Sequence, residues 1–478
     1  MSLRAEAIRG AIWTYGQQFG TQFISFIVSV FLARILLPEE FGLIGMITIL
    51  MGIGTTLFDG GMTSSLIRSE SLEDSDYSTV FIFNFAVSIS VYILMIISAP
   101  LIANFYHQPT LTSIIRVYGL SFVFSAFGSV QNTILTKELN FKKQAILNIP
   151  SIIFGGVVAI LMANLDFGVW SLVAMTLCNT FLLSLLLWLS SPWKPKLIFT
   201  YEKFKKHFNY GYKLTISGIL DIVFTNIYQI IIGRFFSAKL VGYYTRANQL
   251  MMMPVGNVST ALNKVAFPLF AKMQDDIHRL KNAYKKIMLI VLYVVNPIIV
   301  LMVILAKPLI VFLFTEKWIE IVPIFQIVCL SGVLYPLHLY NLLILQVKGR
   351  SDLFLKLEII KKILMIIILV ITFYFGFYGL LWGQLVFSII ALFINTFFAG
   401  RILNYPFWRQ IIDIVPLFIL AGLMGIFIYF FDSYLLQNYS NIIRLVGNTI
   451  FGFFFYIGFS YIFKFETLFE IRKIIIRK

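Results

Sequence analysis

Polar side chains recur at four-residue spacing within two otherwise apolar stretches of the chain. One set is Ser217, Asp221, Thr225 and Gln229, and the other is Gln17, Thr21, Ser25 and Ser29. Residues four apart share one face of an α-helix, so each set predicts a polar stripe. Such stripes line a water-filled path or bond to a neighbouring helix. The ionised carboxylate of Asp221 needs water or a partner, which favours a path.

Two charged residues within apolar stretches are further candidates. Asp59, in Phe58-Asp59-Gly60-Gly61, fits either a turn at a helix end or a carboxylate that binds a proton or sodium ion. A charge at the centre of a membrane helix costs roughly 2.5–3.5 kcal/mol. Lys264 therefore favours a cavity or an ion pair over a lipid-facing position.

Four arginines lie near the ends of apolar stretches. They are Arg34, Arg116, Arg234 and Arg246. Each alone fits an interfacial anchor, because the C-terminus of a helix attracts cations. Together they are candidates for a basic rim that binds an anionic substrate.

Patterns typical of enzymes and metal sites are missing from the sequence. The histidines (His107, His207, His278, His338) lack ligand spacing, and Cys178 and Cys329 lie inside apolar runs. No phosphate-binding glycine loop and no His–Ser–Asp grouping stands out. We expect no catalysis, no metal and no cofactor, so any energy coupling would use a proton or sodium gradient.

Composition places these residues in a membrane. Of the 478 residues, 59% are hydrophobic and only 13% are charged, whereas about a quarter of a soluble domain is charged. Runs such as Phe81–Ile102 are long and continuous, as helices require, rather than short and alternating like barrel strands. The sequence therefore predicts an all-α membrane protein.

About fourteen transmembrane helices are expected, because each needs about 20 residues to cross the bilayer. The predicted spans are 10–33, 41–66, 78–104, 112–135, 146–164, 168–190, 211–236, 243–270, 286–306, 321–347, 355–375, 379–399, 410–431 and 443–463. The eighth is the weakest, because it contains Pro254, Asn257, Asn263 and Lys264.

Basic residues orient these spans. Most of the 38 Lys and Arg residues fall in loops on the side that carries both termini, and basic loops stay in the cytoplasm. Both termini are therefore expected to be cytoplasmic. Topology and contact with anionic lipid explain the net charge of +16, so nucleic acid is not expected as a partner. The tail after Phe463 is expected to form an interfacial helix.

The sequence repeats itself at a spacing of about 200 residues. Arg34 with Gly42 eight residues later returns as Arg234 with Gly242. Six spans in each copy give both copies the same orientation, and such paired bundles enclose a central cavity. We expect an N-terminal six-helix lobe (1–200), a C-terminal six-helix lobe (201–400), and two additional helices with a basic tail (401–478). Transport is the expected activity.

Two segments near the N-terminus are distinctive: Gly10-Ala11-Ile12-Trp13 and Ala33-Arg34-Ile35-Leu36-Leu37-Pro38-Glu39-Glu40-Phe41-Gly42. They resemble the N-terminus of Wzx-type polysaccharide exporters of the multidrug/oligosaccharidyl-lipid/polysaccharide flippase superfamily. The resemblance covers essentially the whole chain. It implies flipping of an undecaprenyl-diphosphate-linked oligosaccharide across the bacterial inner membrane for O-antigen, capsule or exopolysaccharide assembly. It also implies alternating access, ion coupling, and contact with membrane lipids and other polysaccharide-assembly proteins.

Three alternatives stay open. An ion-coupled multidrug exporter of the same fold is one alternative, because fold alone does not fix function. Such an exporter would be expected to have twelve helices and acidic sites. A membrane glycan polymerase or ligase would be expected to carry a sizeable outward loop, and the sequence predicts none. A lipid II flippase would differ only in its glycan, and the N-terminal motif weighs against it.

Overall fold

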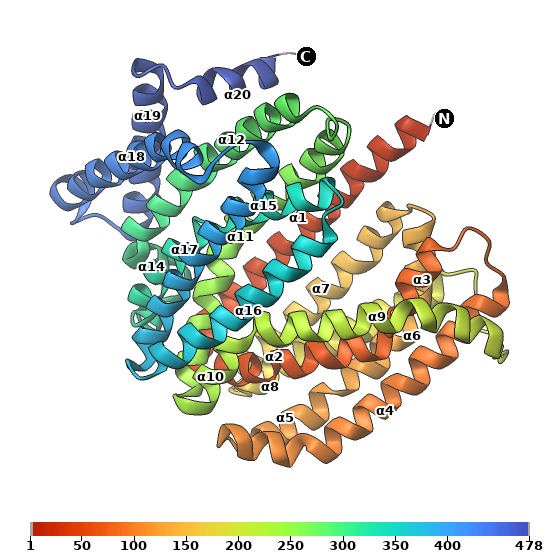
Figure 1. The fold of residues 1–478 in the computed structure, drawn as a ribbon. Helices are drawn as coiled ribbons and strands as arrows, with labels where there is room; N and C mark the ends of the chain where they lie inside the picture. Colours follow the sequence, from red (N-terminus) through yellow and green to blue (C-terminus); the bar gives the residue numbers. More distant parts are fainter. Residues whose placement is uncertain (1–2, 477–478) are drawn as a thin grey trace. The chain divides into compact units, whose positions relative to one another are not determined.

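The computed structural model describes residues 3–476, which form helices and loops without a strand (Figure 1). The predicted all-α fold is therefore confirmed. The chain divides into two compact units, Met1–Gly242 and Tyr243–Lys478. The division into lobes at residues 200 and 400 stays a prediction.

The first unit contains ten helices of the described residues. They are α1 (Leu3–Ile35), α2 (Pro38–Asp59), α3 (Met62–Arg68), α4 (Asp74–Tyr106), α5 (Leu111–Tyr118), α6 (Leu120–Lys137), α7 (Phe141–Asn164), α8 (Val169–Ser190), α9 (Tyr201–Thr225) and α10 (Ile227–Phe235). Helix α7 packs on α1 and α8, and α6 packs on α8 and α4. Helix α9 packs on α2, α3 and α4.

Helix α11 (Ala238–Ala271) begins in the first unit and continues into the second. The remaining helices of the second unit are α12 (Ile277–Ile304), α13 (Ala306–Phe314), α14 (Ile321–Gly332), α15 (Tyr335–Val347), α16 (Ser351–Phe373), α17 (Gly376–Leu403), α18 (Phe407–Phe431), α19 (Asn441–Ile462) and α20 (Glu466–Ile476). Helix α17 packs on α15 and α16, and α18 packs on α12 and α19. The tail is helical as predicted, and its interfacial position stays a prediction.

By length and composition, eleven helices of the described residues can cross a membrane, or twelve if α9 and α10 form one span bent by 50°. The two predicted spans outside this set fall on α11 and α16. Both helices are long enough, but polar residues such as Lys264 lower the hydropathy of α11, and α16 carries several charged residues, among them Lys361 and Lys362. The chain is a multi-pass membrane protein, and the count of fourteen is not confirmed.

Two left-handed glycines interrupt the predicted span over 41–66. Gly60 and Gly61 have φ angles of +53° and +66°, so α2 ends at Asp59 and α3 begins at Met62. Glycine takes this conformation without the steric cost that other residues bear. The prediction of one continuous helix at 41–66 is wrong for this reason.

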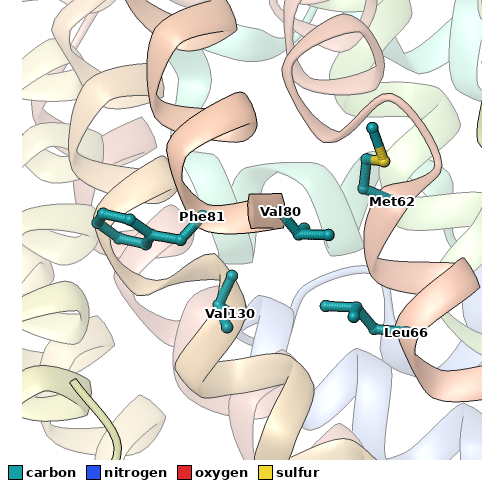
Figure 2. Packing of buried hydrophobic residues seen from close by; sticks show 5 residues of the cluster. All are labelled: Met62, Leu66, Val80, Phe81 and Val130. Atoms are coloured by element: carbon teal, nitrogen blue, oxygen red, sulfur yellow. The ribbon is translucent and has the colours of Figure 1, made fainter. Parts of the chain in front are cut away.

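Apolar side chains from three helices hold α3 in place. Met62 and Leu66 of α3, Val80 and Phe81 of α4, and Val130 of α6 form one buried cluster. Figure 2 shows Val80, Met62 and Leu66 around one space between α4 and α3, with Val130 of α6 beside it and the ring of Phe81 extending to the other side. Trp193, from the segment that leads into α9, and Phe204, in the first turn of α9, pack against the same cluster. The cluster therefore positions the start of α9 as well as α3.

The two copies of the repeated arginine–glycine motif meet at their backbones. A Cβ atom on Gly42 would lie 1.7 Å from the carbonyl oxygen of Ala238, and one on Gly242 would lie 2.0 Å from that of Pro38. Pro38 and Ala238 occupy equivalent places in the two copies, so the contact is symmetric. The glycine in each motif allows the first turns of α2 and α11 to approach this closely.

Candidate functional site

Three of the four predicted rim arginines occupy the last turns of helices in the first unit. Arg34 ends α1, Arg116 ends α5 and Arg234 ends α10. The partial negative charge at a helix C-terminus stabilises a cation in this position. Arg34 and Arg116 are exposed to solvent, and Arg234 is half-buried.

The backbone contact between the repeats brings two of these helix ends into one region. Arg34 lies four residues before Pro38, and Arg234 lies four residues before Ala238. A guanidinium nitrogen of Arg234 also donates to Nε2 of His107 at the end of α4. The ends of α1, α4 and α10 therefore present cationic or hydrogen-bonding groups on the same side of the first unit.

The other two basic candidates lie on α11 in the second unit. Arg246 is half-buried, and its Nη1 donates to Oε1 of Gln249 over 2.7 Å. Lys264 is exposed, eighteen residues farther along the same helix. Their assignment to the substrate stays a prediction.

The polar stripe on α9 faces outward from its unit. Ser217, Asp221 and Thr225 are all exposed, whereas Gln229 lies on α10 beyond the 50° bend. No cation pairs with Asp221 among the described residues, so its carboxylate depends on water. The stripe is therefore shorter than the four predicted residues, and the exposed part fits a water-filled path.

The matching stripe on α1 has fewer exposed polar side chains. Ser25 is exposed, while Thr21 is half-buried and its hydroxyl donates to the carbonyl of Gln18 over 3.1 Å. The side chain of Gln17 lies outside the described residues. Of this stripe, Ser25 is the described candidate whose side chain is exposed.

Asp59 occupies the turn that ends α2. Its Oδ1 accepts a hydrogen bond of 2.6 Å from the hydroxyl of Thr63, and Gly60 follows it in the left-handed conformation. This geometry is that of a helix end, one of the two roles expected for it. Its role in ion binding stays a prediction.

A buried polar cluster that the sequence analysis did not predict joins α3, α4 and α9. Ser65 Oγ lies 2.8 Å from Nδ1 of His207, and His207 Nε2 lies 3.1 Å from Oδ1 of Asp76. All three side chains are buried. This is a Ser–His–Asp chain, but the buried serine cannot meet a substrate, and Lys203 Nζ lies 2.7 Å from Oδ2 of Asp76. The cluster fastens α9 to its neighbours.

Opposite charges fasten the segment before α9, and the first turn of α9, in the same way. Lys196 pairs with Asp74, and Lys203 pairs with Glu73 as well as Asp76, each at 2.7 Å. The acidic groups surround the first turn of α4, where the helix dipole also favours them. The hydrogen bond from Lys203 holds the pKa of Glu73 below its ordinary value. An acidic run facing a lysine-rich segment was the available sequence signal for this contact.

The second unit has a half-buried histidine of its own. His338 on α15 has its Nε2 3.1 Å from Oγ of Ser388 and its Nδ1 3.2 Å from Nδ2 of Asn395, both on α17. These contacts join two helices inside an apolar bundle. Residues 3–476 hold no group of three or more His, Cys, Asp or Glu side chains that could bind a metal ion.

Relatives of the chain extend over most of its length. The lipopolysaccharide biosynthesis protein WzxC of Escherichia coli (strain K12) is 26% identical over 378 residues, which cover 78% of this chain and 76% of that protein. The succinoglycan biosynthesis transport protein ExoT of Rhizobium meliloti (strain 1021) is 26% identical over 329 residues, 69% of this chain and 67% of that one.

Solved structures share the fold. The lipid II flippase MurJ in an inward closed conformation superposes with a TM-score of 0.74 and 17% identity, covering 95% of this chain and 98% of that one. An inward-facing multidrug resistance MATE family transporter of the MOP superfamily gives a TM-score of 0.63 and 16% identity, covering 80% and 95%.

A family model described as polysaccharide biosynthesis protein matches residues 31–323. The match contains α2 to α10, the repeated arginine–glycine motif and the segment that bears the exposed stripe of α9. Because it covers more than half of the sequence, the chain belongs to the polysaccharide biosynthesis protein family.

Proposed function

We propose that this protein is a flippase that moves an undecaprenyl-diphosphate-linked oligosaccharide across the bacterial inner membrane for surface polysaccharide assembly. The observation that carries the proposal is the exposed Asp221 face of α9 in a membrane helix, within the same unit as the exposed arginines Arg34 and Arg116. A chain that only anchored itself in lipid would have no use for exposed polar groups on a spanning helix.

The chemistry of such a substrate matches these groups. A diphosphate carries at least two negative charges that hydrocarbon excludes, and arginine binds phosphate oxygens through paired hydrogen bonds. Sugar hydroxyls need hydrogen-bonding partners, which Ser217, Asp221 and Thr225 offer. The isoprenoid tail can stay in lipid while the head group crosses.

The names of the relatives support a role in polysaccharide assembly. They refer to the biosynthesis of lipopolysaccharide, teichuronic acid and succinoglycan, and one is a transport protein. A lipid II flippase and multidrug transporters share the fold, which fits transport by alternating access. The multidrug exporter is the second candidate, but the family and the arginine-rich helix ends favour an anionic glycan. A polymerase or ligase has no support from the relatives.

Coupling and topology complete the proposal. Both termini face the cytoplasm, a proton or sodium gradient drives the cycle, and Asp59 and Asp221 are the candidate coupling carboxylates. Membrane lipids and other polysaccharide-assembly proteins are the partners. This orientation rests on the tendency of loops rich in Lys and Arg to stay on the cytoplasmic side of the membrane.

The test is the fate of lipid-linked glycan in cells that lack the protein. Membranes would be extracted, and undecaprenyl-linked oligosaccharides analysed together with a probe of leaflet exposure. Complete repeat units should accumulate on the cytoplasmic side and clear on re-expression. Unchanged glycan with altered resistance to cationic drugs would favour the multidrug exporter instead, and flipped but unpolymerised units would favour the polymerase.

A further inference from the structure

An aromatic groove lies between α6 and α8 on the surface of the first unit. Its cavity volume is about 410 Å³, and its walls include Phe124 and Phe127 of α6 and Phe181, Leu185 and Trp188 of α8. Phe181 and Trp188 are seven residues apart, which makes the groove about 10 Å long. Its walls are almost wholly apolar, so its occupant must be apolar along this length.

Small residues at the crossing of the two helices create the groove. A Cβ atom on Gly128 would lie only 3.2 Å from Oγ of Ser184, so α6 and α8 approach closely there. The aromatic side chains stand around this crossing. Trp188 fixes one wall, because its Nε1 donates to the carbonyl of Phe127 over 2.6 Å.

Two lysine ammonium groups lie at one end of the groove. Lys194 also lines the groove, and its Nζ lies 5.1 Å from the centre of the Trp188 ring. Its ammonium donates to the carbonyl of Trp188, and Lys143 Nζ donates to the carbonyl of Ser190 over 2.6 Å. Carbonyl oxygens leave the positive charges of both lysines unneutralised, and no carboxylate pairs with either lysine among the described residues.

We propose that this groove binds one anionic phospholipid, with an acyl chain along the aromatic walls and the phosphate at Lys194 and Lys143. The chain is a multi-pass membrane protein, so an apolar surface groove of a spanning helix pair is filled from the bilayer. The uncompensated lysines select the charge of the head group. A tryptophan at the junction of apolar groove and charged end is the usual side chain of a membrane interface.

Native mass spectrometry of the full-length protein in detergent tests the proposal. Phosphatidylglycerol and phosphatidylcholine with identical acyl chains would be titrated separately. The wild type should bind the first phosphatidylglycerol several-fold more tightly than phosphatidylcholine. Lys194→Gln should weaken phosphatidylglycerol binding on the order of fivefold, the effect of one basic residue at an anionic membrane surface, and leave phosphatidylcholine binding unchanged.

Lys196→Gln is the matched control. Lys196 lies two residues away, is similarly exposed and pairs with Asp74, so its charge is already compensated. This variant removes the same charge from the same segment and should bind phosphatidylglycerol like the wild type. Equal losses in the two variants would reduce the effect to general basic charge and overturn the site.

A groove-filling variant tests the acyl chain separately. Leu185 is 41% exposed, so Leu185→Trp can occupy the groove without entering the core, and it should weaken binding of both lipids. Equal affinity of the wild type for the two lipids would contradict the proposal. A dimer of this chain that Leu185→Trp abolishes would also contradict the proposal, because a second copy of the chain would then occupy the groove. Displacement of phosphatidylglycerol by equimolar undecaprenyl phosphate would contradict it as well, because it would assign the groove to the carrier lipid. Because Lys194 is exposed, its variant keeps the test decisive if Leu185→Trp fails to fold.

Discussion

Gly42→Ala should loosen the contact between the two copies of the repeat. The new Cβ atom would lie 1.7 Å from the carbonyl oxygen of Ala238 and 2.5 Å from its carbonyl carbon, and such contacts essentially never fall below 3.0 Å. To bring the distance from the new Cβ atom to the Ala238 oxygen from 1.7 Å up to 3.0 Å, the first turns of α2 and α11 must separate by about 1.3 Å. A backbone oxygen cannot rotate away as a flexible side chain can.

The free energy of unfolding should fall by about 2 kcal/mol. Overpacking costs about 1–3 kcal/mol, and contact with rigid backbone places this case near the upper value. Alanine in place of glycine returns up to about 1 kcal/mol through helix propensity. For a unit of this size, the expected loss corresponds to an apparent melting temperature roughly 4–8 °C lower.

The assay is the temperature at which detergent-solubilised protein is lost from the monodisperse peak in size-exclusion chromatography. Gly458→Ala on α19 is the control, because its Cβ would meet nothing within 4 Å, and it should melt at or slightly above the wild-type temperature. Gly242→Ala should resemble Gly42→Ala, and the double variant should lose less than the sum, since both act on one contact. A Gly42→Ala protein as stable as the Gly458→Ala protein would refute the backbone contact.

Three further predictions concern charged residues. Lys264→Ala should impair transport, because it removes a charge from the predicted substrate path. The protein should keep its wild-type abundance, because an apolar residue does not hinder membrane insertion; normal transport would remove Lys264 from the path. Asp76→Ala should lower the free energy of unfolding by about 3 kcal/mol, because it leaves a buried cluster without its anion. Asp74→Ala removes one partner of an exposed ion pair and should cost less than about 1 kcal/mol in the same thermal assay. Equal losses in the two variants would contradict the role of burial. Because the pKa of Glu73 is lowered in the folded protein, its pairing with Lys203 stabilises above the unfolded pKa and is lost as the pH falls through the folded value. Melting temperatures of wild type and Lys203→Gln should therefore differ near neutral pH and converge in acid, and a constant difference would argue against this linkage.

Local patterns in the sequence predicted the helices well. A helix lies at each predicted span, because long apolar runs leave the backbone no other way to satisfy its hydrogen bonds in lipid. The repeat also pointed to Gly42 and Gly242, whose role appears only when the two copies meet. The interruption at Gly60 and Gly61 was visible as a glycine pair, but hydrophobicity alone favoured continuity.

Contacts between distant residues could not be predicted from one sequence. His207 and Asp76 are 131 residues apart, and their bond depends on how α9 packs on α4. The bend after Thr225 likewise separates Gln229 from a stripe that has perfect helical spacing. Spacing identifies a shared face only while the helix continues, and tertiary packing decides where it stops.

Reconstituted transport of a defined substrate tests the central claim most directly. Full-length protein would be placed in liposomes that contain an undecaprenyl-diphosphate-linked oligosaccharide, and a membrane-impermeant glycosidase would report how much glycan becomes accessible. The account predicts faster loss of protected glycan with protein than without it, and slower loss in the Arg34→Ala variant. If protected glycan were lost no faster with the protein than in protein-free liposomes, under either a proton or a sodium gradient, the result would contradict the proposed flippase.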